Sequence, residues 1–261
     1  MLRAESLTLR AGRRLLVEDL RLELAPGQRW AVLGRNGAGK STLLHALAGL
    51  RAPDDGQVLL EGTPLARVPR RAAARRIGVL LQEETREYWG SVRDYALLGC
   101  YPRGRSLFGP AEEDRAAAQR ALYALHLEAF ADRTYRSLSG GERQRTRLAA
   151  VFAQMPAAYM LDEPLQHLDL LHQVTVLERL DEEAVARRAL IVTVLHDLAF
   201  AVRHCDHALL LFGDGGYACG PIGEVLTEAA LERLYGVALE QHRVAGQTLF
   251  VPRRADGGAR V

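Results

Sequence analysis

The chain has 261 residues, of which 48% are hydrophobic and 25% charged, and its formal net charge is +2. These values fit one large or two small globular domains and exclude disordered and fibrous proteins, while the small net charge gives no case for nucleic-acid binding. Three scattered cysteines suit a reducing cytosol, the first ten residues hold no apolar run of signal-peptide length, and no apolar run is long enough to span a membrane.

Short apolar segments predict an α/β fold. Residues 17–24 alternate loosely before Pro26-Gly27, and residues 29–33 form an apolar run that stops at Gly34. Leucines at 43, 44, 47 and 50 then follow helical spacing. Further strands are predicted at residues 57–60, 77–81, 159–161, 190–195 and 208–212. A helical pattern over residues 170–186 separates two of them, which favours parallel strands.

The segment between Arg93 and Pro156 differs in texture, since Ala, Arg, Glu and Leu dominate it and it contains no convincing strand. We interpret it as a mostly helical insertion. The prediction is one domain over residues 1–252, with a core at about 1–90 and 157–225, a helical subdomain at about 91–156 and a small accessory segment at about 226–252. Residues 253–261 are predicted to be a flexible tail.

Residues 34–41 match the phosphate-loop pattern G-x-x-x-x-G-K-[ST] between a predicted strand and helix. Its glycines allow backbone N–H groups to surround phosphate oxygens, its lysine reaches the β- and γ-phosphates, and its serine can ligate Mg²⁺. Of the 34 basic residues 33 are arginine, and Lys40 is the only lysine. The predicted nucleotide-binding residues here are Gly34, Arg35, Asn36, Gly37, Ala38, Gly39, Lys40, Ser41 and Thr42.

Two adjacent carboxylates, Asp162 and Glu163, end the predicted strand at 159–161. Neighbouring side chains on a strand point to opposite sides, so the two can serve different parts of one reaction. Asp162 suits the Mg²⁺ shell, and Glu163 suits the general base that polarises the attacking water.

The segment Leu138-Ser139-Gly140-Gly141-Glu142 resembles the signature motif of ATP-binding cassette (ABC) ATPases. The motifs also follow that family's order: phosphate loop, Gln82, signature, Asp162-Glu163, Leu168-Asp169 and His196. The resemblance covers roughly residues 2–240. It implies a P-loop core with a parallel sheet, an N-terminal antiparallel β-subdomain and an inserted helical subdomain.

The resemblance also implies a head-to-tail homodimer with two ATP molecules between the subunits. Ser139, Gly140 and Gly141 of one subunit would then meet the phosphate loop of the other, and Asp169 would contact the opposite subunit. Gln82 would approach Mg²⁺ and the attacking water, and His196 would contact the γ-phosphate. ATP and Mg²⁺ are the implied ligands, with Ser41, Gln82 and Asp162 near the metal.

Two positions depart from the family. Ala11 stands where an aromatic residue usually stacks on adenine, which predicts weaker or less adenine-selective binding unless another side chain substitutes. The loop at residues 165–169 lacks the early Thr or Ser of many relatives, although it retains Asp169.

Residues 91–102 and the surroundings of Asp169 and His196 resemble ATPases of importers for iron–siderophore, haem and cobalamin complexes. This implies separate permease subunits, a substrate-binding protein acting indirectly, and a peripheral place on the cytoplasmic face of the cell membrane. The alternatives are the ATPase of an exporter or lipid-handling system, and a soluble ABC ATPase without a transport role.

Three other features have simpler interpretations. Arg67 to Arg76 form a basic run that fits a solvated helix face. His204, Cys205 and His207 lack a matching ligand cluster, so a structural role is favoured over metal binding. Trp89 fits either a contact with a permease or core packing.

Overall fold

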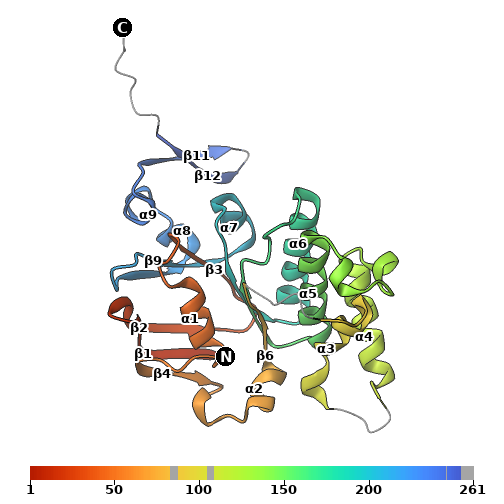
Figure 1. The fold of residues 1–261 in the computed structure, drawn as a ribbon. Coiled ribbons are helices and arrows are strands. Elements are labelled where there is room, and N and C mark those ends of the chain that lie inside the picture. The colour runs from red at the N-terminus through yellow and green to blue at the C-terminus, as the bar shows by residue number, and fades with distance from the viewer. Residues whose placement is uncertain (83–87, 105–108, 245, 254–261) are drawn as a thin grey trace.

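The computed structural model describes residues 1–82, 88–104, 109–244 and 246–253 (Figure 1). Apart from Arg253, the tail predicted at 253–261 lies outside the described residues. Within the described ranges, no helix is both long and apolar enough to cross a membrane.

An antiparallel sheet of strand order β2-β1-β4-β5 forms one side of the molecule. Its strands are β1 (Leu2–Ala11), β2 (Arg14–Leu24), β4 (Asp55–Leu60) and β5 (Thr63–Pro64). In β1, Leu2, Leu7 and Leu9 are fully buried, and Leu2 lies opposite both Leu24 and Leu60. The antiparallel subdomain implied by the resemblance is present, but the residue pattern did not predict β1, because its alternation breaks where the register shifts around Ser6, whose φ is +48°.

The second sheet has the order β10-β9-β3-β8-β7-β6, and all its strands except the edge strand β10 run parallel. Its strands are β3 (Arg29–Gly34), β6 (Ile77–Leu80), β7 (Ala158–Asp162), β8 (Leu190–Val194), β9 (His207–Leu211) and β10 (Tyr217–Pro221). The predicted α/β core with parallel strands is therefore confirmed. The apolar runs are continuous because both faces of this sheet are covered.

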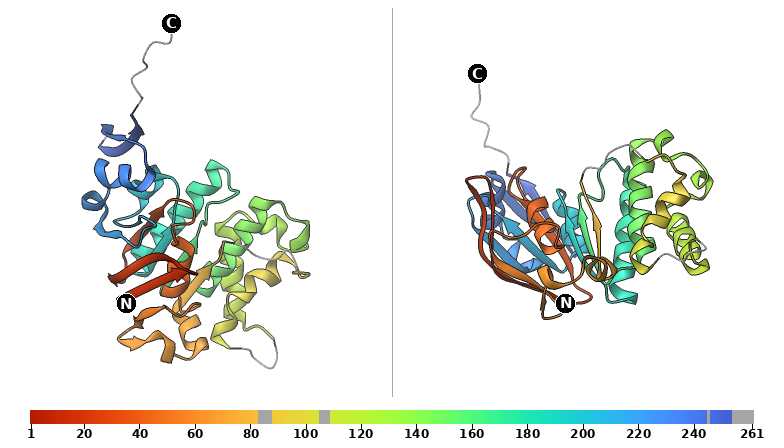
Figure 2. Two further views of the ribbon diagram at one scale, coloured as in Figure 1. Left: turned by 60° about the vertical axis from the view of Figure 1, so that its left-hand side comes forward. Right: turned by 60° about the horizontal axis from the view of Figure 1, so that its bottom comes forward.

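Helices flank the parallel sheet on both faces (Figures 1 and 2). They are α1 (Lys40–Leu47), α2 (Arg70–Arg76), α6 (Leu170–Ala186) and α7 (Leu198–His204), with a 3₁₀ turn at Leu65–Arg67. The boundaries of α6 agree with the predicted helix. Helix α1 ends before the predicted Leu50, because Gly49 adopts a left-handed φ of +73° and leaves Leu50 58% exposed.

The predicted helical insertion is confirmed and packs against one side of the parallel sheet (Figure 2, right). It holds α3 (Val92–Leu98), α4 (Glu112–Ala124) and α5 (Gly140–Gln154), with 3₁₀ turns at Tyr101–Arg103, Glu128–Phe130 and Tyr135–Ser137. Ser91 and Asp94 form a capping box at the start of α3, and Ser139 and Glu142 form one at the start of α5.

The C-terminal part forms a small layer beside α7 (Figure 1). It contains α8 (Ile222–Val225), α9 (Glu228–Tyr235) and the hairpin of β11 (Leu239–Val244) with β12 (Gln247–Pro252). Leu231 and Leu234 of α9 are buried together with Leu33 and Leu210 of the parallel sheet. This layer is therefore anchored to the same sheet that carries the phosphate loop.

Candidate functional site

The phosphate loop lies between β3 and α1, as its motif predicts. Gly37 and Gly39 have φ values of +78° and +103°, which glycine adopts without steric cost. Lys40 is buried, and its Nζ donates to the carbonyl oxygens of Gly34 at 2.9 Å and Arg35 at 3.1 Å. Burial lowers the pKa of Lys40, and the charges of Glu163 and Asp162 oppose that shift.

Asp162 ends β7 and is almost fully buried. Neither of its carboxylate oxygens has a hydrogen-bond partner among the described residues. The Ser41 hydroxyl nevertheless lies near enough to favour the ionised form of Asp162. Burial raises the pKa of Asp162, and Ser41, His45 and Lys40 act against that shift. An unpartnered buried carboxylate beside a serine hydroxyl is a donor set that fits Mg²⁺.

Glu163 directly follows β7 and pairs with His196, which follows β8. The distance between His196 Nε2 and Glu163 Oε1 is 2.7 Å. The Glu163 side chain is only 14% exposed, whereas that of His196 is 51% exposed. Because β7 and β8 are parallel neighbours, their carboxyl ends bring these two side chains to one edge of the sheet.

A pocket of about 530 Å³ opens at this edge. Its walls include Asn36 of the phosphate loop together with Gln82, Glu163 and His196. Four predicted site residues from four separate segments thus meet in one cavity. Residues 83–87, which follow Gln82, lie outside the described part of the chain.

The signature residues lie elsewhere. Ser139, Gly140 and Gly141 begin α5, and none of them is among the described residues that line the pocket. A Cβ on Gly141 would lie 2.9 Å from the carbonyl oxygen of His167, so the loop at residues 165–169 packs tightly on the start of α5. Ser139 remains exposed at the surface.

Asp169 caps α6, accepting from the backbone N–H of His172 at 3.0 Å and facing His172 Nδ1 at 2.7 Å. These contacts hold the pKa of Asp169 below its usual value. Its side chain is 67% exposed and is not among the described residues that line the pocket.

Ala11 is exposed at the end of β1 and lies opposite Arg14 across the β1–β2 turn. Arg14 Nη2 donates to the carbonyl oxygen of Gly213 at 3.1 Å. A Cβ on Gly37 would lie 3.6 Å from Arg14 Nη1, so this guanidinium borders the phosphate loop. The cross-strand neighbour of Ala11, the position where the family usually carries an aromatic residue, is therefore an arginine that borders the phosphate loop.

Other sequence features resolve structurally. Among the described residues no group of three or more His, Cys, Asp and Glu side chains could hold a metal ion, and His204 pairs with Asp181 at 2.7 Å. Trp89 is 75% exposed with the Arg136 guanidinium 4.0 Å from its ring centroid, so core packing is wrong for this residue.

Two residues of α5 that the sequence analysis left out of the site contact it. Gln144 donates to the carbonyl oxygens of Glu163 and Pro164, and Arg147 donates to Gln144. Because the two residues are three positions apart, the sequence predicts that they share one face of a helix, but it does not predict which residues that face contacts.

Comparisons with known proteins agree with this geometry. Residues 17–166 match the family described as ABC transporter. The chain is 41% identical over 260 residues to the hemin import ATP-binding protein HmuV of Pseudomonas entomophila (strain L48), covering 97% of this chain and 100% of that protein. It is 37% identical over 253 residues to the ferric enterobactin transport ATP-binding protein FepC of Escherichia coli (strain K12), covering 96% and 93%.

A solved structure of a metal-chelate type ABC transporter in an inward-facing conformation has a TM-score of 0.81 to this chain at 30% identity. The match covers 97% of each chain. Together with the ordered motifs at the edge of the parallel sheet, these similarities mean that the chain belongs to the ABC transporter family, as an ATP-hydrolysing ATPase subunit.

Proposed function

We propose that this chain hydrolyses ATP to power a separate membrane permease that imports a metal chelate. The Glu163–His196 pair beside the phosphate loop is the observation that carries the hydrolytic role. Similarity to proteins named for hemin import and ferric enterobactin transport favours haem or an iron–siderophore as cargo over cobalamin. No observation favours the exporter, lipid-handling or non-transport alternatives.

The phosphate loop binds the nucleotide. Lys40 exchanges its contacts with the Gly34 and Arg35 carbonyls for phosphate oxygens, and the N–H groups from Gly37 to Thr42 cradle the β-phosphate. Asp162 and Ser41 would hold Mg²⁺, with Gln82 as a further candidate ligand, and the metal would supply positive charge to balance that on the phosphate oxygens.

Glu163 acts as the general base. Its carboxylate takes a proton from the water that attacks the γ-phosphorus, the bond to the bridging oxygen breaks, and ADP and phosphate result. His196 holds the carboxylate through the 2.7 Å contact and reaches toward the γ-phosphate. Gln82, which lines the same pocket, orients the water.

Ser139, Gly140, Gly141 and Asp169 act on a second copy of the chain. Ser139 and Asp169 are exposed, and none of the four is among the described residues that line the chain's own pocket, which supports a head-to-tail dimer in which one copy's signature closes the other's ATP site. A serine hydroxyl and glycine N–H groups at the start of α5 suit the γ-phosphate.

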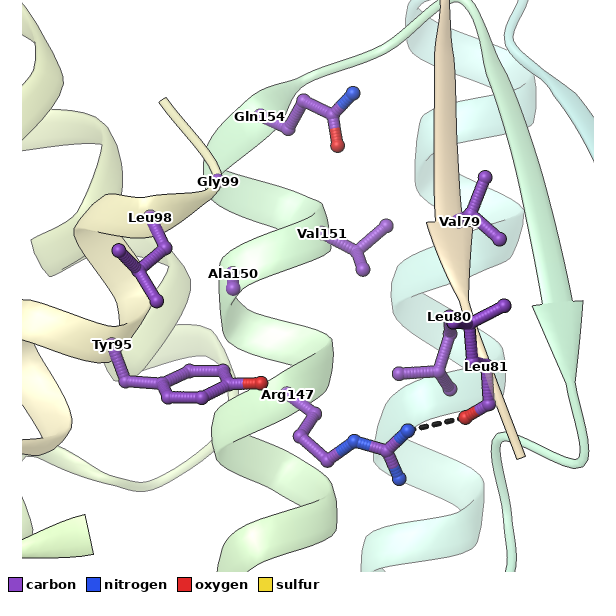
Figure 3. Close-up of a pocket in the computed structure, with 10 residues that line it drawn as sticks. All are labelled: Val79, Leu80, Leu81, Tyr95, Leu98, Gly99, Arg147, Ala150, Val151 and Gln154. Carbon is purple, nitrogen blue, oxygen red and sulfur yellow. Dashed lines mark hydrogen bonds between the residues drawn. The ribbon is translucent and has the colours of Figure 1, made fainter. Parts of the chain in front are cut away.

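A groove of about 250 Å³ between β6, α3 and α5 is the proposed permease contact (Figure 3). Its apolar lining includes Leu81 and Leu98, which are 39% and 49% exposed. Leu81, which lines the groove, directly precedes Gln82, which lines the ATP pocket. A permease segment seated in the groove would therefore touch the chain segment that leads into the ATP pocket. The proposal includes a peripheral position on the cytoplasmic face of the membrane, and a substrate-binding protein that acts on the permease from the other side.

The subdomain boundaries predicted from the sequence are also part of the proposal. The catalytic core comprises residues 1–90 and 157–225, the permease-facing helical subdomain residues 91–156, and the accessory segment residues 226–252.

Substitution Glu163→Gln tests the proposal. It keeps the size and shape of the side chain but removes the base, so ATP turnover should fall by about 10²–10⁴-fold while ATP binding persists. ATP should then hold the variant as a dimer, measurable by size-exclusion chromatography with light scattering. Turnover equal to that of the unaltered protein would refute the assignment.

A further inference from the structure

Gln144 contacts the backbone around the proposed catalytic base. It lies on α5, is 5% exposed, and its Nε2 donates to the carbonyl oxygen of Glu163 at 3.3 Å and to that of Pro164 at 3.0 Å. Its Oε1 accepts from Arg147 Nη1 at 2.9 Å. Both ends of this buried amide are therefore engaged.

Arg147 extends the contact to the permease groove. Its Nη2 donates to the carbonyl oxygen of Leu81, the residue directly before Gln82, and Figure 3 shows this hydrogen bond within the groove. Leu81, Arg147 and Gln144 thus form a continuous chain of hydrogen bonds that ends at the carbonyls of Glu163 and Pro164.

The backbone of Glu163 needs such support. Its φ of +49° lies in the left-handed region, which is unfavourable for a residue with a side chain and persists only where surrounding contacts enforce it. The amide of Gln144 binds the carbonyl of this residue and the next one. A change in that contact would move the Glu163 carboxylate relative to the attacked phosphate, and such displacements are costly to turnover.

We propose that Gln144 and Arg147 form a positioning relay that holds Glu163 in its hydrolytic conformation and ties it to the segment entering Gln82. Neither residue touches the reacting atoms. The relay rests on the proposed role of Glu163 as the base. It makes the chemistry sensitive to whatever fills the groove, because Leu81 lines the groove and bonds to the relay.

Gln144→Glu tests the end at Glu163. The new carboxylate keeps an acceptor for Arg147 but cannot donate to the two carbonyls. We expect kcat for ATP to fall by about ten- to a hundredfold, with KM for ATP changed by no more than about twofold. The same exchange at the exposed Gln247 of β12 is the matched control and should leave both parameters unchanged.

A merely structural role would change KM and the melting temperature together with kcat. Gln144→Met provides a second variant of similar length without donor or acceptor, and it should show the same split between kcat and KM. Unchanged kcat in both variants, or parallel loss of kcat, ATP affinity and folding, would overturn the proposal.

A double-mutant cycle tests whether the two residues act as a unit. Arg147→Met should lower kcat, and Arg147→Lys, which keeps a charged donor, should restore part of it. The double variant Gln144→Glu/Arg147→Met should lose no more activity than the worse single variant. Losses that multiply would show two independent contacts and contradict the relay.

The failure of this inference differs from failure of the proposed function. If Glu163→Gln retains turnover, the general base is wrong and both proposals fall. If Glu163→Gln abolishes turnover but Gln144→Glu leaves kcat unchanged, the relay alone is wrong.

Discussion

Lys40 is the only lysine among the 34 lysine and arginine residues of the chain. Its ammonium fits between two carbonyl oxygens of its own loop, at a position that is only 6% exposed. The wider, planar guanidinium of arginine needs more space and spreads its donors over a fork. The loop therefore selects a compact point charge.

Lys40→Arg should lower ATP affinity and kcat/KM by at least about tenfold, because the larger group displaces either the loop or the phosphate. Fluorescent-nucleotide binding and steady-state ATPase rates measure both effects. The control is Arg67→Lys, which exchanges the same two residue types in the reverse direction at an exposed position and should leave both quantities unchanged. Normal activity of Lys40→Arg would reduce the single lysine to coincidence.

Ala11 leaves the adenine side of the site without an aromatic ring, and the nearby Arg14 is engaged by the Gly213 carbonyl. Ala11→Tyr should tighten ATP binding by about five- to a hundredfold, since stacking on a base is worth about 1–3 kcal/mol. Titrations with ATP and GTP check this. A strong preference of the unaltered protein for ATP over GTP would instead show that adenine is already recognised.

At the scale of elements, α5 has several tasks. Its first turn carries the signature residues, its middle holds the Gln144–Arg147 relay, and its C-terminal half packs against α3. Where α3 ends, Gly99 lies so close to α5 that a Cβ would meet the carbonyl oxygen of Ala150 at 1.8 Å. The glycine is required here by close approach, since its φ of −60° suits any residue.

Gly99→Ala should destabilise the protein by about 1–3 kcal/mol, the usual cost of overpacking a close contact. Denaturant unfolding followed by circular dichroism measures the difference. Gly223→Ala in α8 is the matched control, because a Cβ there would meet nothing within 4 Å. Equal stability of the two variants would mean that α3 shifts freely on α5.

At the scale of the whole molecule, Asp181 of α6 links three parts of the fold. It binds Arg29 Nη1 of β3 at 2.9 Å and His204 Nδ1 of α7 at 2.7 Å. Burial acts to raise its pKa, but the contacts with His204 and Arg29 prevail and hold the pKa below its usual 3.8.

Because the folded-state pKa of Asp181 lies below the unfolded value, its contribution to stability is present above about pH 4 and is lost as the pH falls through that range. The free energy of unfolding should therefore be higher for the unaltered protein than for Asp181→Ala near pH 7, and the gap should narrow toward pH 3. Chemical denaturation at a series of pH values checks this. A gap independent of pH would show that Asp181 contributes by packing alone.

Much of the fold follows from local patterns. The continuous apolar runs predicted β3, β7, β8 and β9 because buried parallel strands need apolar side chains on both faces. Helix α6 was predicted to the residue from its periodicity. By contrast, β1 was not predicted from its residue pattern, because the bulge near Ser6 interrupts the alternation of apolar and polar residues. Strands β11 and β12 are too exposed to show such an alternation clearly.

The candidate site divides in the same way. The order of motifs predicted the phosphate loop, Asp162, Glu163 and His196 as site residues, since each motif is a short contiguous segment. The partnership of Gln144 with Glu163 and of Arg147 with Leu81 was not predictable, because these contacts span 19 and 66 residues of chain. Likewise, only packing left Trp89 outside the core.

By itself, the sequence determined the family, the nucleotide-binding chemistry and the parallel core, because these depend on residue types at fixed local spacing. The tertiary structure alone decided which separate segments meet. It shows the 2.7 Å contact between Glu163 and His196, the buried carboxylate of Asp162, and the hydrogen bonds that run from Leu81 through Arg147 and Gln144 to the backbone of Glu163. Those features arise where strand ends and helix faces converge, and that convergence is a property of packing in three dimensions.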